Sequence, residues 1–492
     1  MNLATSFARC AEKNAGKTAV FWGEAEHSYQ QLLAQSRRVA RHLQAELKVQ
    51  PNDRVGLWLK NRPEFISAIF GALEAGAVVV PINNFLKPDE VSYILRDAGA
   101  KVLITEATEA QLQLSEKLPN LKILQVEHFA GLPDLDRETE PPKRTESDLA
   151  VIIYTSGTTG KPKGAMLSHG NLLSNVASCR QVLETVELDR FVVLLPMFHS
   201  FMLCVGIMLP MTTGCSILLI KSLHPPKNII HEVIARQATI LPAIPQFFRA
   251  LATSQLPPDI PLRLCISGAA PLPTEILKEF NRKLPIPLIE GYGLSEASPV
   301  VSLNPIRGPW KAGSIGIPIA GVEVTVLDEN GRVLADGEVG EICVRGDNVM
   351  QGYWNQPEET SKALRNNWLL TGDVGYRDED GYFFITDRKK DMLLVNGINV
   401  YPREIEEVIY QFPGVKEAAV VGQPDPRKGE QPIAFVAANE GASLDEKALL
   451  QFVRSKLADY KVPRRAILMP ALPRNATGKV LKTTLRQMPQ PP

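Results

Sequence analysis

The chain has 492 residues, more than one domain usually holds, and this length predicts roughly three folding units. Hydrophobic residues make up 45% and charged residues 22%, as in an ordinary globular protein. Because 54 basic residues balance 54 acidic ones, the formal net charge is zero and offers no long-range field for nucleic acid or an anionic membrane. We therefore expect no nucleic-acid partner, and any bound polyanion must be held by a local site.

The cysteines and the N-terminus indicate a cytoplasmic protein. The six cysteines are far apart, form no Cys-x-x-Cys pair and have no histidines at zinc spacing, so we expect reduced, buried thiols. The first residues include Arg9, Glu12 and Lys13 and lack the apolar region of a signal peptide. The uncharged run 201–220 approaches the length of a membrane span. Since Pro210 and Gly214 interrupt it, we expect a helix, a turn and a short strand there instead.

Helices and strands alternate through the first 283 residues. The expected helices are 32–47, 63–75, 90–98, 171–182, 229–236, 245–252 and 274–283, and the expected strands are 54–59, 78–81, 101–105, 149–153, 190–195, 240–241 and 263–267. This alternation predicts an α/β fold with two doubly wound, mostly parallel subdomains. The polar segment 134–148 is expected to be an exposed linker before strand 149–153 and the loop that follows it.

The character of the sequence changes in the last third. From about 313 to 386, short strands such as 322–327 and 340–345 are separated by turn residues, which predicts a small β subdomain. Helix 402–410, strands 417–421 and 432–437, and helix 445–457 then predict an α+β unit. We expect an N-terminal domain over 1–386, a hinge at 387–391 and a small mobile C-terminal domain over 392–492, with a frayed proline-rich end at 489–492.

A loop of glycines and hydroxyls follows the apolar strand 149–153. Its residues are Thr155, Ser156, Gly157, Thr158, Thr159, Gly160 and Lys161. Glycines let backbone N–H groups approach an anion closely, hydroxyls add donors, and lysine supplies charge. Two residues separate Gly157 from Gly160, so the loop does not have the spacing of a Walker A motif. We predict that it holds a polyphosphate.

Further motifs follow the loop in order. They are Gly291-Tyr292-Gly293-Leu294-Ser295-Glu296, Leu370-Thr371-Gly372-Asp373, Asp387-Arg388-Lys389-Lys390-Asp391, Gly397 followed by Tyr401-Pro402-Arg403-Glu404-Ile405-Glu406, and Pro473-Arg474-Asn475-Ala476-Thr477-Gly478-Lys479. Together with the loop, this set resembles the motifs of the adenylate-forming enzymes, which include acyl-CoA and aryl-CoA synthetases, peptide-synthetase adenylation domains and luciferases. The resemblance covers nearly the whole chain and is strongest to medium- or long-chain fatty-acid–CoA ligases.

The resemblance implies a reaction in two steps. A carboxylate attacks the α-phosphorus of ATP to give an acyl-adenylate and pyrophosphate, and the thiolate of coenzyme A then displaces AMP. It implies that the loop Thr155 to Lys161 wraps the β- and γ-phosphates and that Glu296 binds Mg²⁺ with help from Thr155. Both steps then depend on positioning and charge neutralisation, without a protein nucleophile.

The resemblance also implies the rest of the nucleotide site. Tyr292 is similar to the residue that stacks on adenine, Asp373 to the carboxylate that binds the ribose hydroxyls, and Arg388 to the guanidinium that assists it. The remaining residues expected around the nucleotide are Gly268, Ala269, Ala270, Glu290, Gly291, Gly293 and Ser295, the last standing where most relatives have threonine.

Lys479 is similar to the catalytic lysine that enters from the C-terminal domain during adenylation. In the family this domain then rotates about the position of Lys390. The rotation withdraws the lysine and brings the loop around Gly397 to the tunnel for coenzyme A, where a side chain would obstruct the pantetheine.

The segment 196–201 resembles the one that opens the acyl pocket, with His199 near the carboxylate and Phe198 beside it. The uncharged residues that follow, including Val205 and Gly206, suit an alkyl chain, and no charged residue stands out to bind the ammonium of an amino acid. We therefore expect a medium- or long-chain fatty acid as the small-molecule substrate.

Three alternatives stay open. They are a fatty-acyl-AMP ligase that passes its adenylate to a carrier protein, an aryl-CoA ligase, and a non-catalytic scaffold on the same fold. Transient contact with a membrane surface and a homodimer are also compatible with the sequence.

Overall fold

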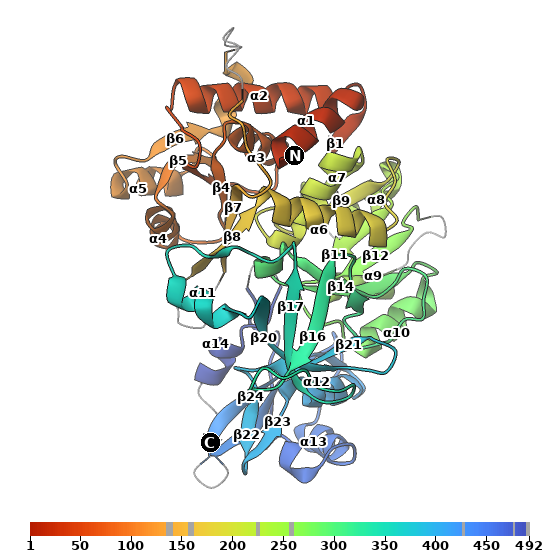
Figure 1. The fold of residues 1–492 in the computed structure, drawn as a ribbon. Helices are drawn as coiled ribbons and strands as arrows, with labels where there is room; N and C mark the ends of the chain where they lie inside the picture. The colour runs from red at the N-terminus through yellow and green to blue at the C-terminus, as the bar shows by residue number, and fades with distance from the viewer. Residues whose placement is uncertain are drawn as a thin grey trace.

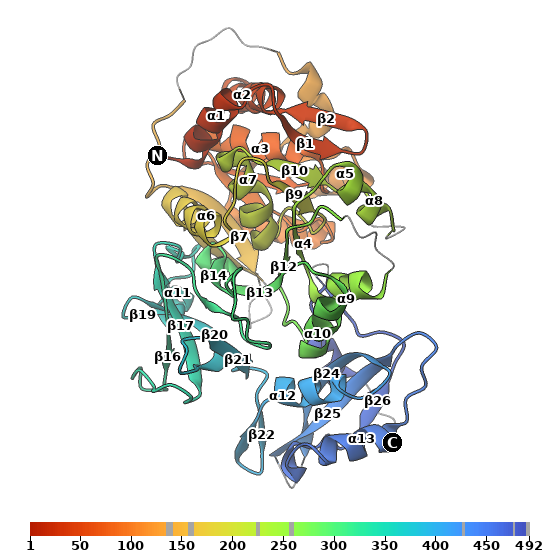
Figure 2. The same ribbon diagram turned by 90° about the vertical axis from the view of Figure 1, so that its right-hand side faces the viewer.

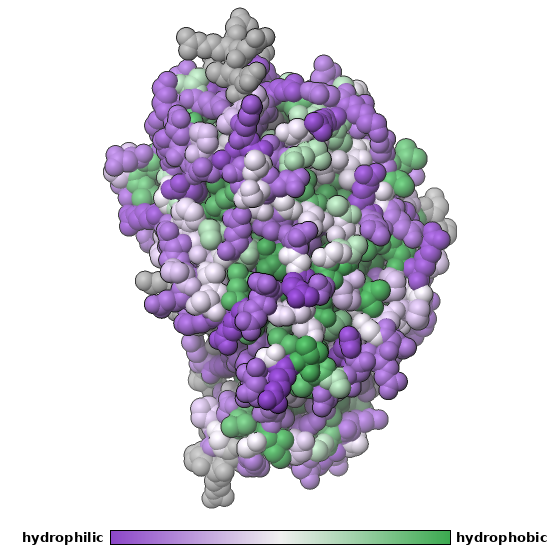
Figure 3. All heavy atoms as spheres, viewed as in Figure 1, coloured by the Kyte–Doolittle hydropathy of each residue, from purple (hydrophilic) through white to green (hydrophobic). Residues whose placement is uncertain are grey.

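The computed structural model describes residues 1–133, 141–155, 162–222, 227–254, 260–425, 429–475 and 478–488. Two large sheets with their helices form one end of the molecule, and the C-terminal segment, blue in Figure 1, forms the other end. In the view of Figure 3, hydrophilic side chains cover most of the surface and hydrophobic ones are interspersed among them. The predicted fraying at 489–492 and part of the predicted linker lie outside the described ranges; residues 141–148 lack helix and strand, as expected.

The first sheet has seven strands in the order β18-β8-β7-β4-β3-β5-β6. These are β18 (Gly352–Tyr353), β8 (Lys163–Ser168), β7 (Leu149–Thr155), β4 (Val78–Pro81), β3 (Arg54–Trp58), β5 (Ala100–Thr105) and β6 (Lys122–Gln125), with helices α3 (Pro63–Glu74), α4 (Pro88–Ala98) and α5 (Glu109–Lys117) and the 3₁₀ turn η1 (Val126–Gly131). The predicted strands are confirmed, and their parallel pairing is confirmed from β6 through β7. β8 runs antiparallel to β7, so the expected phosphate loop is the connection of a hairpin.

The second sheet has nine strands in the order β15-β14-β13-β12-β11-β9-β10-β1-β2. These are β15 (Ile317–Pro318), β14 (Val300–Leu303), β13 (Leu288–Gly293), β12 (Leu264–Ser267), β11 (Ile240–Ala243), β9 (Arg190–Val193), β10 (Ser216–Leu219), β1 (Thr18–Trp22) and β2 (Ala25–Ser28). Its helices are α1 (Leu3–Lys13), α2 (Tyr29–Ala45), α6 (His169–Val182), α8 (Lys227–Ala235), α9 (Pro245–Thr253) and α10 (Thr274–Lys283). One buried apolar cluster joins the two sheets, and within it the rings of Phe7 on α1 and Phe70 on α3 stack with centroids 4.1 Å apart.

The uncharged run 201–220 folds into the interior of this pair of sheets. It forms η2 (Met202–Met208), a π-helical segment, then α7 (Leu209–Thr213) and β10. The prediction of a helix, a turn and a strand is confirmed, with the wider π turn as an added feature that often marks functional sites. Among the described residues, no helix is both long enough and apolar enough to cross a membrane.

A smaller sheet follows. It contains β16 (Val322–Leu327), β17 (Gly340–Gly346), β20 (Trp368–Arg377) and β19 (Leu364–Arg365), with β21 (Phe383–Arg388) paired to β20 and with helix α11 (Pro357–Ala363) nearby. Strands expected at 322–327 and 340–345 are present. Two short strands from the same part of the chain add to the large sheets, since β15 pairs with β14 and β18 pairs with β8. The boundaries 313–386 stay a prediction.

The C-terminal segment has its own sheet and core. Its strands are β22 (Leu393–Val395), β23 (Ile398–Val400), β24 (Val415–Asp425), β25 (Gly429–Ala438) and β26 (Ala466–Leu468), and its helices are α12 (Pro402–Tyr410), α13 (Glu446–Arg454) and α14 (Lys482–Gln487), with the 3₁₀ turn η4 (Asp459–Lys461). Val395, Ile405, Val420 and Val436 pack in a separate apolar cluster. The predicted α/β architecture with a small α+β C-terminal unit is therefore confirmed.

Candidate active site

Tyr292, Asp373 and Arg388 meet where β13, β20 and β21 come together. The Tyr292 hydroxyl donates to Asp373 Oδ2 at 2.5 Å, and Arg388 Nε lies 3.1 Å from Asp373 Oδ1. Asp373 is 3% exposed, and its charge raises the pKa of Arg388. Burial, and then the charge of Asp373, raise the pKa of Tyr292 well above its ordinary value, so the hydroxyl remains a donor. The structure thus places together the three residues expected at adenine and ribose.

The residues expected opposite the adenine follow β12. Gly268 is buried, and a Cβ added there would lie 3.2 Å from Phe201 Cε1, so the glycine lets the aromatic ring lie against the backbone. Ala269 has φ +65°, a left-handed conformation that is uncommon outside glycine and often found at functional sites. Ala270 is half-buried next to it.

Glu290 occupies a different place from the other residues expected around the nucleotide. Its Oε1 accepts from the Leu272 N–H at 3.0 Å and lies 4.0 Å from Arg403 Nη2, on the C-terminal helix α12. Burial raises its pKa to about 7, and Arg403 opposes that rise. Glu290 is therefore at the contact between the two parts of the molecule, whereas Gly291 and Gly293 line the cavity described below.

The phosphate end of the site is described in part. Thr155 is the last residue of β7 and pairs with Lys163 at the start of β8; its hydroxyl donates to the Lys163 carbonyl at 3.5 Å. Ser156, Gly157, Thr158, Thr159, Gly160 and Lys161 lie outside the described residues, so their role stays a prediction. Lys163, a further lysine of the loop, is 9% exposed and forms an ion pair with Glu359 on α11.

Glu296 lies in η3 (Ser295–Ala297), directly after β13. Its Oε1 accepts from the Tyr353 hydroxyl at 2.8 Å, and its backbone carbonyl accepts from the Met350 N–H at 2.8 Å. The neighbouring Ser295 hydroxyl donates to Ser200 Oγ at 3.1 Å. In the described parts of the chain, no group of three His, Cys, Asp or Glu side chains could hold a metal ion. One carboxylate oxygen not occupied by Tyr353 fits a Mg²⁺ that takes most of its ligands from phosphate and water.

Lys479 lies in the segment between β26 and α14, within electrostatic reach of Arg388 and Asp373. Desolvation lowers its pKa to about 8; the charge of Arg388 contributes to the decrease, and Asp373 opposes it. Lys479 in turn contributes, after burial, to lowering the pKa of His199 to about 4. Burial and the charge of Arg388, which lower the pKa of Lys479, also lower the pKa of Lys390 in the turn after β21. The structure therefore brings the predicted lysine, carboxylate and histidine to one site.

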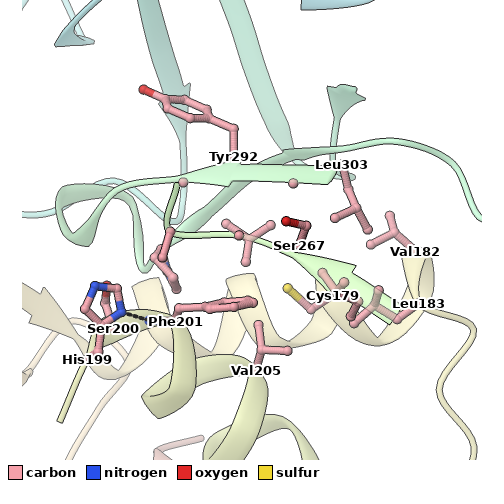
Figure 4. Close-up of a pocket in the computed structure, with 17 residues that line it drawn as sticks. Cys179, Val182, Leu183, His199, Ser200, Phe201, Val205, Ser267, Tyr292 and Leu303 are labelled. Atoms are coloured by element: carbon pink, nitrogen blue, oxygen red, sulfur yellow. Dashed lines mark hydrogen bonds between the residues drawn. The ribbon is translucent and has the colours of Figure 1, made fainter. Parts of the chain in front are cut away.

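His199 lies at the mouth of a cavity between η2, β12, β13 and α6 (Figure 4). Its Nδ1 accepts from the Phe201 N–H at 3.3 Å, and with a pKa near 4 the ring is neutral, so Nε2 carries the proton. The empty space, part of it open to solvent, measures about 550 Å³. The lining residues are Cys179, Val182, Leu183, His199, Ser200, Phe201, Val205, Ile266, Ser267, Gly268, Ala269, Gly291, Tyr292, Gly293, Pro299, Val300 and Leu303.

Of the four residues expected to bind the acid, two line this cavity and two do not. His199 and Val205 line it, whereas Phe198 and Gly206 are buried behind its wall. A Cβ on Gly206 would lie 3.0 Å from Met202 Sδ, so Gly206 packs into the core. Sequence reasoning missed the end of the cavity farthest from His199, which Val182 at the end of α6 and the following Leu183 form with Leu303 of β14 (Figure 4). These three side chains are apolar and ordinary for a core, so local sequence offers no signal for them.

Polar contacts hold the C-terminal part against the rest. Arg249 on α9 donates from Nη2 to Val415 O at 3.0 Å and to Asn439 Oδ1 at 2.8 Å. The Thr274 N–H on α10 donates to Glu407 Oε2 on α12 at 3.5 Å, and Figure 2 shows α12 directly below α10. This arrangement is the one that brings Lys479 to the site.

Comparison with known proteins identifies the family. Residues 7–354 match the AMP-binding enzyme family, and residues 404–479 match the AMP-binding enzyme C-terminal domain. The chain belongs to the AMP-binding enzymes. The resemblance to adenylate-forming enzymes that the motifs indicated is thereby confirmed.

Curated relatives of this AMP-binding enzyme cover it nearly end to end. It is 34% identical to a long-chain-fatty-acid–CoA ligase of Bacillus subtilis, over 95% of this chain and 91% of that enzyme. It is 36% identical to a feruloyl-CoA synthase of an Amycolatopsis species, over 97% of both chains. Relatives with different acids in their names are thus about equally similar.

Two solved structures of one protein, MatB from Rhodopseudomonas palustris, differ in how well they match. Both are 34% identical to this AMP-binding enzyme and cover 99% of both chains. The TM-score is 0.92 for the ATP-bound form and 0.80 for the apo form. Since the sequence and coverage are the same, the difference lies in conformation, and this chain matches the ATP-bound form more closely than the apo form.

Gly397 lies away from the cavity in this arrangement. It forms the turn of the β22–β23 hairpin with Asn396, and the two residues have φ values of +79° and +52°. Among the described residues outside its chain neighbours, no heavy atom lies within 4 Å of a Cβ built on Gly397, and Figure 2 shows β22 at the lower, C-terminal end of the molecule, well below β12. Its role at coenzyme A, and that of Lys390 as a pivot, stay predictions.

Proposed function

We propose that this chain is an AMP-forming acyl-CoA ligase. In the first step, a carboxylate oxygen of the acid attacks the α-phosphorus of ATP, and pyrophosphate leaves. In the second step, the thiolate of coenzyme A attacks the acyl carbon, and the bond from that carbon to the AMP oxygen breaks. The observation that carries the proposal is the convergence of Lys479, the Tyr292–Asp373–Arg388 group and His199 at one largely apolar cavity. The comparisons support ATP-dependent acyl-CoA ligase activity at this level.

The residues of the first step have complementary charges. With a pKa of about 8, the Lys479 ammonium is mostly protonated at neutral pH and can neutralise charge on the carboxylate and the α-phosphate. The neutral His199 ring offers an Nε2–H donor to the substrate carboxylate without adding positive charge. Asp373 with Tyr292 and Arg388 would hold the ribose, and Glu296 with Thr155 would hold Mg²⁺. When bound, Mg²⁺ supplies charge neutralisation at the phosphates.

The second step requires a different position of the C-terminal part. While Lys479 faces the nucleotide, the Gly397 hairpin lies at the far end of the molecule. We propose that rotation about residues 387–391, with Lys390 as the pivot, exchanges the two. Coenzyme A then enters along the Gly397 hairpin.

We propose a medium- or long-chain fatty acid as the first candidate substrate. None of the described residues that line the cavity is Asp, Glu, Lys or Arg, and most of them are apolar. An alkyl chain gains about 0.8 kcal/mol for each buried methylene, so such a wall discriminates by chain length. The named fatty-acid relative supports this choice.

An aryl acid is the second candidate. The feruloyl-CoA synthase relative is as similar to this chain as the fatty-acid ligase. The Phe201 ring against Gly268 gives the cavity an aromatic wall, which suits a flat ring.

The experiment that tests the proposal is pyrophosphate release with ATP and Mg²⁺ across straight-chain acids of increasing length and several aryl acids, each with and without coenzyme A. Turnover that requires coenzyme A and peaks with one alkyl length supports the fatty-acid ligase. A peak with aryl acids replaces the first candidate with the second. A single burst of pyrophosphate that coenzyme A does not change contradicts the proposed acceptor and indicates a carrier protein.

The expected location is a proposal as well. All six cysteines are buried, unpaired thiols, which is the state maintained in a reducing cytoplasm. We propose a cytoplasmic enzyme whose partners are small molecules and which contacts a membrane at most peripherally.

A further inference from the structure

Tyr353 is a contact of the candidate nucleotide site that the motifs did not indicate. It is half-buried on β18, and its hydroxyl donates to Glu296 Oε1 at 2.8 Å. A carboxylate that accepts one fixed hydrogen bond has a restricted orientation.

The same short segment holds Glu296 at two points. Three residues before Tyr353, the Met350 N–H donates to the Glu296 backbone carbonyl at 2.8 Å. The contact between the Tyr353 hydroxyl and the Glu296 carboxylate is not needed to form the turn after β13, because it involves only the end of the Glu296 side chain. Backbone and carboxylate of Glu296 are therefore fixed relative to one piece of chain.

That piece of chain is also tied to the phosphate loop. β18 pairs with β8, the strand that leaves the loop, in the register Tyr353 to Ala165 and Gly352 to Met166. At the first residue of β8, the Lys163 ammonium lies 5.4 Å above the Tyr353 ring and forms an ion pair with Glu359. Lys163 thus anchors the loop exit to α11 and to Tyr353.

A further bond fixes the backbone of Tyr353. Its N–H donates to Thr360 Oγ1 at 2.8 Å, and the next N–H, that of Trp354, donates to Gly164 O at 2.7 Å. With the backbone held on both sides, the hydroxyl has little freedom to leave Glu296. The result is a rigid connection from the base of the phosphate loop to the carboxylate expected to face the metal.

We propose that Tyr353 is a positioning residue that orients the Glu296 carboxylate so that its other oxygen faces the metal–triphosphate complex. The inference rests on the proposed function, because it assigns Tyr353 a role through Glu296. It differs from a purely structural role in one respect: removing the hydroxyl should change the part of ATP affinity that depends on Mg²⁺.

The test is calorimetric titration of ATP, with Mg²⁺ and with EDTA, into the wild type, Tyr353→Phe, Glu296→Gln and the double variant, without any acid. The Tyr353→Phe change keeps the ring under Lys163 and removes only the hydroxyl. We expect it to reduce the Mg²⁺-dependent gain in affinity about 10-fold or more, the usual effect of losing a partner of a metal ligand. In the Glu296→Gln background the same change should have less than about a twofold effect, because the carboxylate it orients is gone.

Tyr382→Phe is the matched control, since its hydroxyl donates to the Pro309 carbonyl at 2.5 Å, away from Glu296. It should leave both affinities unchanged, and thermal unfolding should show that all variants are folded. A normal Mg²⁺-dependent gain in Tyr353→Phe, with a lost gain in Glu296→Gln, overturns the inference and leaves the proposed function intact. The inference is also overturned if the fold-changes of Tyr353→Phe and Glu296→Gln multiply in the double variant. If the wild type and Glu296→Gln bind alike, the metal role of Glu296 is wrong and the inference falls with it.

Discussion

The walls of the acyl cavity and the lysine that faces its mouth are held in place by different forces. The walls come from buried strands and from α6, and their side chains Cys179, Val300 and Leu303 belong to the large apolar core cluster. Lys479 is brought in by a domain whose contacts with the rest include the side-chain hydrogen bonds of Arg249. The half of the site used in both steps is fixed by core packing. The half that we propose leaves after adenylation is held by polar contacts.

The energies of the two kinds of contact explain this division. Apolar burial contributes about 25 cal/mol for each Å² removed from water, so the core that carries the cavity walls cannot open during turnover. A typical hydrogen bond contributes about 0.5–1.5 kcal/mol net, because water replaces it when the contact opens. A few such bonds hold one arrangement without trapping it. The better match to ATP-bound than to apo MatB agrees with an arrangement that a bound nucleotide favours.

Lys479→Ala should have the largest effect, since it removes the charge that the movable half supplies. We expect adenylate formation, measured by pyrophosphate release, to fall about 100- to 1,000-fold, as when other enzymes lose one group that stabilises transition-state charge. Thioester formation from supplied acyl-adenylate should change little. Lys456→Ala, at an exposed lysine of the same domain, is the control. Equal slowing of both steps would refute the assigned role.

Gly397→Leu should produce the opposite pattern. We expect about tenfold or greater slowing of thioester formation, because a leucine side chain would occupy the path of the pantetheine, and a normal burst of pyrophosphate. Gly397→Ala shares the cost of a side chain at φ +79° but adds little bulk, so it separates backbone strain from obstruction. Rapid thioester formation in Gly397→Leu would remove the proposed tunnel role.

The sequence predicted the regular elements of the large domain well because their signals are local. Apolar runs such as Ala150–Ile153 mark buried strands, and periodic segments with proline at the first turn mark helices such as α3 and α12. It did not predict that β8 reverses to form a hairpin or that β18 adds to its far side. Strand partners far apart in sequence are chosen by tertiary packing, which no local pattern records.

The candidate site shows the same limit. Motifs indicated Tyr292, Asp373, Arg388 and Lys479, which the structure brings together, because each motif has its own sequence signature. Gly206 was placed at the acid by its position in an uncharged run, yet its neighbours are core side chains. Tyr353 carried no signal, since its meaning depends on a hydroxyl reaching Glu296, 57 residues away. Contacts of this kind become visible once the chain is folded.

Arg249→Ala tests the polar contacts directly and should have a smaller effect. Losing the bonds to Val415 and Asn439 should shift the domain away from the position that presents Lys479, slowing adenylate formation about three- to tenfold. Thioester formation should be unchanged or faster, because that step uses the other position. Arg236→Ala is the control, since Arg236 pairs with Glu26 within the N-terminal part at 2.6 Å. Slowing of thioester formation by Arg249→Ala would show that the contact matters beyond docking.

A change of pH near neutrality should have the smallest effect on the rate of adenylate formation. Desolvation lowers the Lys479 pKa from 10.5 to about 8, so its charge is present below pH 8 and is lost as the pH rises through 8. Between pH 8 and 10.5 the docked domain binds fewer protons than the undocked one, so docking itself is favoured as the pH rises there. A falling rate in that window therefore reports loss of charge and not undocking.

Measured at low ATP, kcat/KM for pyrophosphate release should fall about twofold from pH 7 to pH 8, about fivefold from pH 8 to pH 9 and about tenfold from pH 9 to pH 10. The decrease of kcat should begin at a higher pH than the decrease of kcat/KM, because the phosphates of bound ATP raise the pKa of Lys479. Lys479→Arg keeps a charge that does not titrate in this range, so its slower reaction should have a flat profile up to pH 10. If the rate of Lys479→Arg falls with pH as that of the wild type does, the titrating group is not Lys479 but a group of the fixed part of the site. The charge needed for adenylation would then belong to the fixed part and not to the C-terminal domain.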